Sequence, residues 1–122
     1  MKVAVFTGIR DLEVCERPMP VLERPGDVLL QIETVGVCGS DIHYYTEGRI
    51  GGQVIEHPAT LGHECAGTVV KVGSVVAGLE AGQRVAIDPA ISCGRCDQCE
   101  QGRSHTCRNL KFLGCPGQAP GA

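Results

Sequence analysis

The sequence predicts a mainly β domain, in which short strands form a partly closed barrel with short helices and a zinc-binding lobe. Seventeen glycines and seven prolines among 122 residues favour frequent turns over long helices. Apolar and polar residues alternate in short segments, with the period of a β-strand. Four cysteines lie close together between positions 93 and 107, which is typical of a metal-binding loop. A chain of this length has room for one modest hydrophobic core.

The clearest predicted strand covers residues 27–35. Gln31 and Glu33 lie on one face of this segment, and the opposite face carries Val28, Leu30, Ile32 and Thr34. This period of two is typical of a half-buried strand. Similar short strands are expected at residues 2–6, 13–16, 66–72 and 84–88, because glycines and prolines between these segments favour turns.

Two short helices are expected beside residues of the metal-ligand type. The first begins near Ser40 or Asp41 and ends at Gly48, and the second begins at Asp97 and ends at Gly102. Each has a polar capping residue at its start and a glycine at its end. Both helices therefore lie next to a group of candidate ligands.

Charge and composition disfavour nucleic acid and membranes as partners. The formal net charge is −3 and aromatic residues make up 3% of the chain, so a basic surface and a stacking platform for nucleic acid are both missing. The longest apolar run near the N-terminus, Val3–Phe6, is far shorter than the ~20 residues of a membrane-spanning helix. We therefore expect a cytoplasmic protein that binds neither nucleic acid nor membrane.

The four clustered cysteines predict a structural zinc site. They are Cys93, Cys96, Cys99 and Cys107. Two-residue spacers allow successive thiolates to take corners of one tetrahedron, each ~2.3 Å from the zinc. Disulfides are the alternative, but a reducing compartment and this spacing favour zinc. Four protein ligands leave no open coordination position, so the lobe, about residues 89–115, is expected to stabilise the fold and to carry no chemistry.

A second candidate metal site combines Cys38 with the adjacent pair His63 and Glu64. Thiolate, imidazole and carboxylate are all good zinc ligands, and three protein ligands leave the fourth position for water or substrate. One thiolate and one carboxylate cancel the charge of Zn(II), which keeps the ion a strong Lewis acid. Taken singly, Cys38 has the alternative of a small buried hydrophobe and His63 that of a core histidine.

These two segments, 36–45 and 61–67, together with the four-cysteine lobe, resemble the N-terminal catalytic domain of zinc-dependent medium-chain alcohol dehydrogenases. The resemblance covers nearly the whole chain and implies a GroES-like fold. The run His43–Gly51 is most similar to the sorbitol and xylitol, or polyol, dehydrogenase branch. By this resemblance, residues 1–122 are the N-terminal part of the catalytic domain. The Rossmann domain that binds NAD(H) or NADP(H) is absent from this chain, which contains no Gly-x-Gly-x-x-Gly motif.

The resemblance also implies roles for residues around the second metal site. Cys38, His63 and Glu64 match the catalytic zinc ligands of the family. The residue at the position of Glu64 is a direct ligand in the polyol branch, whereas in many alcohol dehydrogenases it binds the zinc only transiently or lies just outside the ligand set. Asp41 matches the carboxylate that orients the zinc-bound histidine, which fits the need of a ligating imidazole for a partner on its other nitrogen. The alternative for Asp41 is a helix cap, and one residue can serve both purposes.

Three further residues match family positions that contact the substrate or its proton. Ser40 matches the hydroxyl that binds the substrate alcohol and takes its proton, and His43 matches the histidine that passes the proton to solvent. Tyr44 matches the tyrosine that lines the polyol pocket. The alternatives are a helix cap for Ser40, an ordinary surface position for His43 and a packing role for Tyr44.

The sequence therefore leads to the hypothesis of an NAD(P)-dependent oxidoreductase that oxidises a secondary alcohol of a polyol to a ketone. We expect two zinc ions per chain, one catalytic and one structural, and a homo-oligomer for the full-length enzyme. The isolated chain is expected to be inactive because the nucleotide contacts are missing. Alternatives are a threonine or simple alcohol dehydrogenase of the same family and, in a different class, a non-catalytic zinc-stabilised interaction module.

Overall fold

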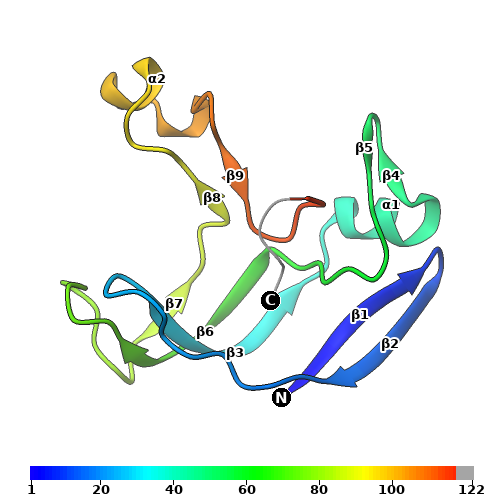
Figure 1. The fold of residues 1–122 in the computed structure, drawn as a ribbon, viewed down its shortest axis with the longest axis horizontal. Helices are drawn as coiled ribbons and strands as arrows, with labels where there is room; N and C mark the ends of the chain where they lie inside the picture. Colours follow the sequence, from blue (N-terminus) through cyan, green and yellow to red (C-terminus); the bar gives the residue numbers. More distant parts are fainter. Residues whose placement is uncertain (118–122) are drawn as a thin grey trace.

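The computed structural model describes residues 1–117 of the chain, which consist mainly of short strands (Figure 1). In chain order the strands are β1 (Lys2–Gly8), β2 (Asp11–Glu16), β3 (Val28–Gly36), β4 (Arg49–Ile50), β5 (Gln53–Val54), β6 (Glu64–Val72), β7 (Arg84–Ala86), β8 (Ala90–Ile91) and β9 (Lys111–Phe112). The helical segments are α1 (Gly39–Glu47), α2 (Asp97–Glu100) and the 3-10 turn η1 (Ser104–Thr106). The predicted mainly β class with short helices is confirmed. None of the helices in the described range is long and apolar enough to cross a membrane.

Within the described residues the strands are arranged in four small antiparallel sheets. β1 and β2 form a hairpin, β3, β6 and β7 form a three-stranded sheet in the order β3-β6-β7, and β4–β5 and β8–β9 are two-stranded pairs. The hairpin meets the rest of the chain at the bridge between Phe6 and Ala59. Within residues 1–117 no closed barrel forms, because β3 and β7 are the outer strands of an open sheet.

The pairing of β3 with β6 positions the second candidate metal site. The two strands align from Val28 opposite Val72 to Gly36 opposite Glu64. Midway, Gly67 lies so close to β3 that a Cβ would stand 2.1 Å from the carbonyl oxygen of Gln31, so only glycine fits there. Since β3 leads into Cys38 and His63 directly precedes β6, the register carries both residues to the same end of the sheet.

Helix α1 follows the predicted boundaries closely. It starts after Cys38 and ends at Gly48, whose φ of 71° is the left-handed conformation that glycine tolerates best. Its inner face buries Asp41 and Tyr44. The hydrophobic core lies between this helix and the β1–β2 hairpin, and it contains Tyr44, Ile55 and Leu61, with Phe6 and Ala59 packed against them.

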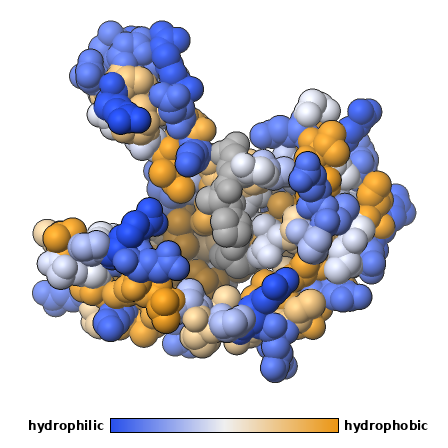
Figure 2. Space-filling model, in the orientation of Figure 1, coloured by the Kyte–Doolittle hydropathy of each residue, from blue (hydrophilic) through white to orange (hydrophobic). Residues whose placement is uncertain are grey.

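The four-cysteine lobe projects from the ends of β8 and β9 (Figure 1). Figure 2 shows hydrophilic residues over most of its visible surface. Cys107 is its one buried hydrophobic residue among those described. Helix α2 is a single turn of four residues that stops at Glu100, slightly before the predicted end at Gly102. With so small an apolar interior, the lobe depends on something other than a hydrophobic core for its stability.

Candidate metal centres

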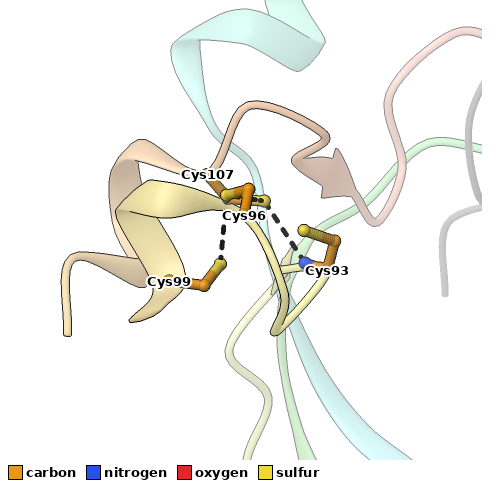
Figure 3. Close-up of side chains that lie close together, drawn as sticks. All are labelled: Cys93, Cys96, Cys99 and Cys107. Carbon is orange, nitrogen blue, oxygen red and sulfur yellow. Dashed lines mark hydrogen bonds between the residues drawn. The ribbon is translucent and has the colours of Figure 1, made fainter. Parts of the chain in front are cut away.

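The four lobe cysteines converge on one point, as the spacing predicts (Figure 3). Their sulfurs all lie within 4.8 Å of one another, and Cys96 Sγ lies 3.6 Å from Cys99 Sγ and 3.9 Å from Cys107 Sγ. All eight cysteines are free thiols, so the structure contains no disulfide in place of this cluster. Backbone N–H groups of Cys93 and Asn109 donate to the Cys107 sulfur at 3.2 and 3.3 Å. Such donors stabilise thiolates, which are the form that binds zinc.

The thiols of the cluster differ in pKa. A hydrogen bond from the Arg95 backbone is the main cause that lowers the pKa of Cys93 to about 6. In contrast, burial and hydrogen bonds with Cys96 and Cys107 raise the pKa of Cys99 to about 11. Close thiols cannot all ionise while no cation balances their charge. The cluster therefore fits a dication, which would stabilise all four thiolates together.

An ion pair on the lobe surface links two segments of the chain that flank the cysteines. Arg108 donates two hydrogen bonds to the carboxylate of Asp97, at 2.5 and 2.7 Å, and these bonds lower the pKa of Asp97 to about 2. Asp97 begins α2, while Arg108 follows Cys107. The pair thus connects the two halves of the lobe.

The second candidate site brings together Cys38, His63 and Glu64. Their ligand atoms also lie within 4.8 Å of one another. His63 is buried, Cys38 is half-buried and Glu64 is exposed, so the set opens toward solvent on the Glu64 side. The three donors are of mixed type, lie close enough to bind one ion and leave one side open. This combination fits the chemistry of a catalytic zinc site.

Asp41 contacts both buried members of this site. Its Oδ2 accepts the backbone N–H of Cys38 at 3.0 Å, and its Oδ1 lies 3.7 Å from Nδ1 of His63. Both Asp41 Oδ1 and His63 Nδ1 are buried without a hydrogen-bond partner. A small approach of the two atoms would pair them and leave Nε2 of His63 as the ligand nitrogen. Asp41 thus caps helix α1, as one interpretation of the sequence expected, and it also faces His63. Its role in orienting a zinc-bound histidine stays a prediction.

Gly36 gives Glu64 its place in the site. A Cβ on Gly36 would stand 2.5 Å from Oε2 and 2.9 Å from Cβ of Glu64. The carboxylate therefore occupies space that only glycine leaves free on the opposite strand. The glycine in the motif Gly36-Val37-Cys38 indicates a close approach of another group. Only the β3–β6 register shows that this group is Glu64.

The three residues with predicted substrate or proton roles lie on α1 in different environments. Ser40 is half-buried in the first turn, and His43 is exposed with Nδ1 3.4 Å from Glu47 Oε1. Tyr44 is only 3% exposed and donates its hydroxyl to Gln53 Oε1 at 3.1 Å. Burial is the main cause that raises the pKa of Tyr44. The packing alternative therefore describes the position of Tyr44, and its role in a substrate pocket stays a prediction.

One residue beside the site was not anticipated from the sequence. Phe112, in β9, packs edge-on against the imidazole of His63, with ring centroids 5.4 Å apart. Nothing in the local pattern indicates this pair, because the two residues are far apart in the chain and meet only through the tertiary fold.

The chain is similar to known proteins over nearly its full length. The sequence profile of the family described as the alcohol dehydrogenase GroES-like domain matches residues 24–122. The chain is 46% identical to a sorbitol dehydrogenase from Bacillus subtilis (strain 168) over 116 residues, which are 95% of this chain and 33% of the relative.

Solved structures extend this similarity to the fold. Galactitol-1-phosphate dehydrogenase from Escherichia coli matches with a TM-score of 0.87 and 31% identity, over 100% of this chain and 34% of the other. L-idonate 5-dehydrogenase from Escherichia coli K-12 matches with a TM-score of 0.86 and 33% identity, over 99% and 35%. The chain therefore spans about a third of the length of the relatives it matches.

Proposed function

The chain belongs to the alcohol dehydrogenase GroES-like domain family, and on this premise we propose that it is the zinc-binding, catalytic-domain part of an NAD(P)-dependent polyol dehydrogenase. The reaction is the oxidation of a secondary alcohol of a polyol to a ketone. The observation that carries this proposal is the convergence of Cys38, His63 and Glu64 with Asp41 behind them. In this proposal residues 1–122 are the N-terminal part of the catalytic domain, with the structural lobe at about 89–115.

Two zinc ions per chain have separate purposes in this proposal. Cys93, Cys96, Cys99 and Cys107 would hold the structural ion, and Cys38, His63 and Glu64 would hold the catalytic one. A zinc ion at the three-ligand site supplies Lewis acidity, which polarises a substrate hydroxyl and lowers its pKa. The thiolate of Cys38 and the carboxylate of Glu64 balance the double positive charge.

The residues of the chain prepare the site for this chemistry. Asp41 holds the loop of Cys38 through its backbone N–H and faces Nδ1 of His63, where a hydrogen bond would keep the imidazole in one tautomer and orientation. Gly36 leaves the space in which the carboxylate of Glu64 lies. Together they place the three donors close to one another, and catalysis requires such prior positioning.

Ser40 and His43 would move the substrate proton. They stand three positions apart on α1 and therefore share one side of the helix. Ser40, half-buried in the first turn, would accept the proton of the substrate hydroxyl, and the exposed His43 would pass it to solvent. Glu47, 3.4 Å from Nδ1 of His43, would orient that imidazole.

The proposal also covers the polyol substrate, the cofactor, the cellular compartment and the oligomeric state. The relatives named sorbitol dehydrogenase and galactitol-1-phosphate dehydrogenase support a polyol over a simple alcohol or threonine. NAD(H) or NADP(H) would bind mainly in a Rossmann domain within the remaining two thirds of a protein of the relatives' length. Eight free cysteines support a reducing, cytoplasmic setting. The full-length enzyme would be a homo-oligomer.

The test is turnover by the protein expressed from its complete gene. Sorbitol and xylitol with NAD⁺ or NADP⁺ should give the ketone and the reduced cofactor, and Cys38→Ser should abolish turnover. Cys15→Ser is the matched control, since Cys15 lies in β2 outside both metal-ligand groups. Turnover of threonine or a simple alcohol alone would replace the polyol assignment. Absence of any turnover in a fully folded protein would favour the interaction module.

A further inference from the structure

The two candidate metal sites are connected through strand β9. Phe112 of β9 packs edge-on against the imidazole of His63, with ring centroids 5.4 Å apart and an angle of 65° between the ring planes. His63 is buried, and Asp41 lies 3.7 Å from its Nδ1. The imidazole therefore lies between one residue of α1 and one residue of β9, the strand that follows the lobe.

The backbone after β9 also lies against the segment that carries His63. Gly114 has a φ of 69°, and a Cβ on it would stand 2.7 Å from the carbonyl oxygen of Gly62, the residue before His63. Both glycines are buried. The segment 112–114 thus contacts His63 with a side chain and contacts the preceding residue with its backbone, so a displacement of this segment removes both contacts.

The position of β9 depends on the lobe. β9 pairs with β8 through Ala90–Phe112 and Ile91–Lys111, and the Leu113 N–H donates to the Pro89 carbonyl at 2.9 Å. Each strand has only two residues, and a pair this short is not stable by itself. The chain between the two strands contains all four lobe cysteines. A metal ion bound by them closes this loop and keeps β8 and β9 together.

We propose that the Cys93–Cys107 lobe, once loaded with metal, holds His63 in its ligand orientation through Phe112 and the Gly114–Gly62 contact. Phe112 is then a positioning residue for the Cys38, His63 and Glu64 centre. Since binding free energies are reciprocal, metal in either site strengthens binding in the other. This inference rests on the proposed function, because it assumes that both groups of ligands bind metal.

The size of the coupling follows from the contact that carries it. An edge-to-face aromatic pair corresponds to a change of roughly three- to tenfold in a binding constant. Loss of Phe112, or loss of metal from the lobe, should each weaken metal binding at the three-ligand centre by about this factor. Loss of both should weaken it no further than loss of the lobe metal alone, because that change already removes the Phe112 contact.

The test is a Co(II) titration of the metal-free 122-residue chain after one equivalent of Cd(II) has filled the lobe, whose four thiolates prefer the softer ion. The affinity and the visible ligand-field bands of the second site are measured for wild type, Phe112→Leu and Phe112→Tyr with Cd(II) in the lobe. They are measured for Cys93→Ser without added Cd(II), because the ion would otherwise enter the second site. Phe6→Leu is the matched control, because Phe6 packs on the core and against Tyr45. Circular dichroism checks that each variant is folded.

The proposal expects weaker Co(II) binding and shifted bands in Phe112→Leu and in Cys93→Ser, near wild-type behaviour in Phe112→Tyr, and no change in Phe6→Leu. The double variant Phe112→Leu with Cys93→Ser should match Cys93→Ser alone. Unchanged affinity and bands in both single variants would overturn the coupling while leaving the proposed function in place. No Co(II) binding to the second site of the wild type would overturn both. If Phe112→Leu does not fold, removal of metal from the lobe in Cys93→Ser still decides the question.

Discussion

Oδ1 of Asp41 lies 3.7 Å from Nδ1 of His63, and both atoms are buried without a hydrogen-bond partner. Burying a carboxylate and an imidazole without hydrogen bonds costs free energy of folding. The arrangement of the two groups therefore requires an explanation. Metal binding through Nε2 of His63 would provide one, because the imidazole would then carry its N–H on Nδ1, which faces Asp41. The same carboxylate accepts the Cys38 N–H, so one side chain organises two ligands.

The first prediction concerns Asp41. Asp41→Ala should weaken zinc binding at the three-ligand centre by about 10- to 100-fold, because the histidine loses its partner and the Cys38 loop loses its cap. Competition with a chromophoric chelator measures this affinity. Asp11→Ala, at an exposed position in β2, is the control and should leave it unchanged. Equal zinc affinity in Asp41→Ala and wild type would exclude the orienting role.

The second prediction concerns the space beside Glu64. Gly36→Ala should push the Glu64 carboxylate away and weaken zinc binding at this centre by about tenfold, or about 1.4 kcal/mol, since its Cβ would overlap that side chain. Gly39→Ala is the matched control, because a Cβ there meets nothing within 4 Å. The same chelator competition compares the two variants. A larger loss in Gly39→Ala than in Gly36→Ala would contradict this account of the site.

The third prediction concerns the lobe after metal removal. A lobe with one buried hydrophobic residue among those described should open when a chelator removes its zinc, while the β3-β6-β7 sheet stays folded. Trypsin should then cut rapidly at Arg95 and Arg103 in the lobe but not at Arg84 in β7. Mass spectrometry of the fragments identifies the sites. Equal protection of the lobe with and without zinc would show that metal does not stabilise it.

The fourth prediction concerns pH and the turn before β3. The Asp27 carboxylate accepts three hydrogen bonds, from the backbone N–H groups of Glu23 and Arg24 and from the Arg24 guanidinium. The bond from the Arg24 backbone is the main cause that lowers the pKa of Asp27. A carboxyl whose folded pKa lies below its unfolded value of 3.8 stabilises the fold above that value. This stabilisation is lost as the pH falls from 3.8 through the lower, folded pKa.

Carboxyl-carbon NMR of Asp27 checks this statement. Because the main cause is a backbone donor, Arg24→Gln should keep most of the lowering, and the titration midpoint should stay below 3.8. In Asp27→Asn the loss of stability relative to wild type should be present at pH 6 and should shrink below pH 3.8. A midpoint that returns to 3.8 in Arg24→Gln would assign the effect to the guanidinium charge instead.

The sequence was informative where a local pattern determines the structure. The alternation in residues 27–35 predicted β3, and cysteine spacing predicted the lobe cluster. A polar start near Ser40 or Asp41 and the glycine at 48 predicted α1, although the structure places the cap one turn earlier, at Cys38. Strands β4, β5, β8 and β9 were not predicted, because two residues are too few to show a period. The contacts of Gly36 with Glu64 and of Phe112 with His63 depend on register and tertiary packing, which no single segment encodes.

The most direct test of the two-centre account is the zinc content of the purified 122-residue chain by elemental analysis. The account predicts two zinc ions in the wild type and one in each single variant, since Cys38→Ser empties the three-ligand centre and Cys93→Ser empties the lobe. Cys15→Ser should keep two. A wild-type chain with one zinc ion that Cys38→Ser retains would contradict the account and would leave only the structural lobe.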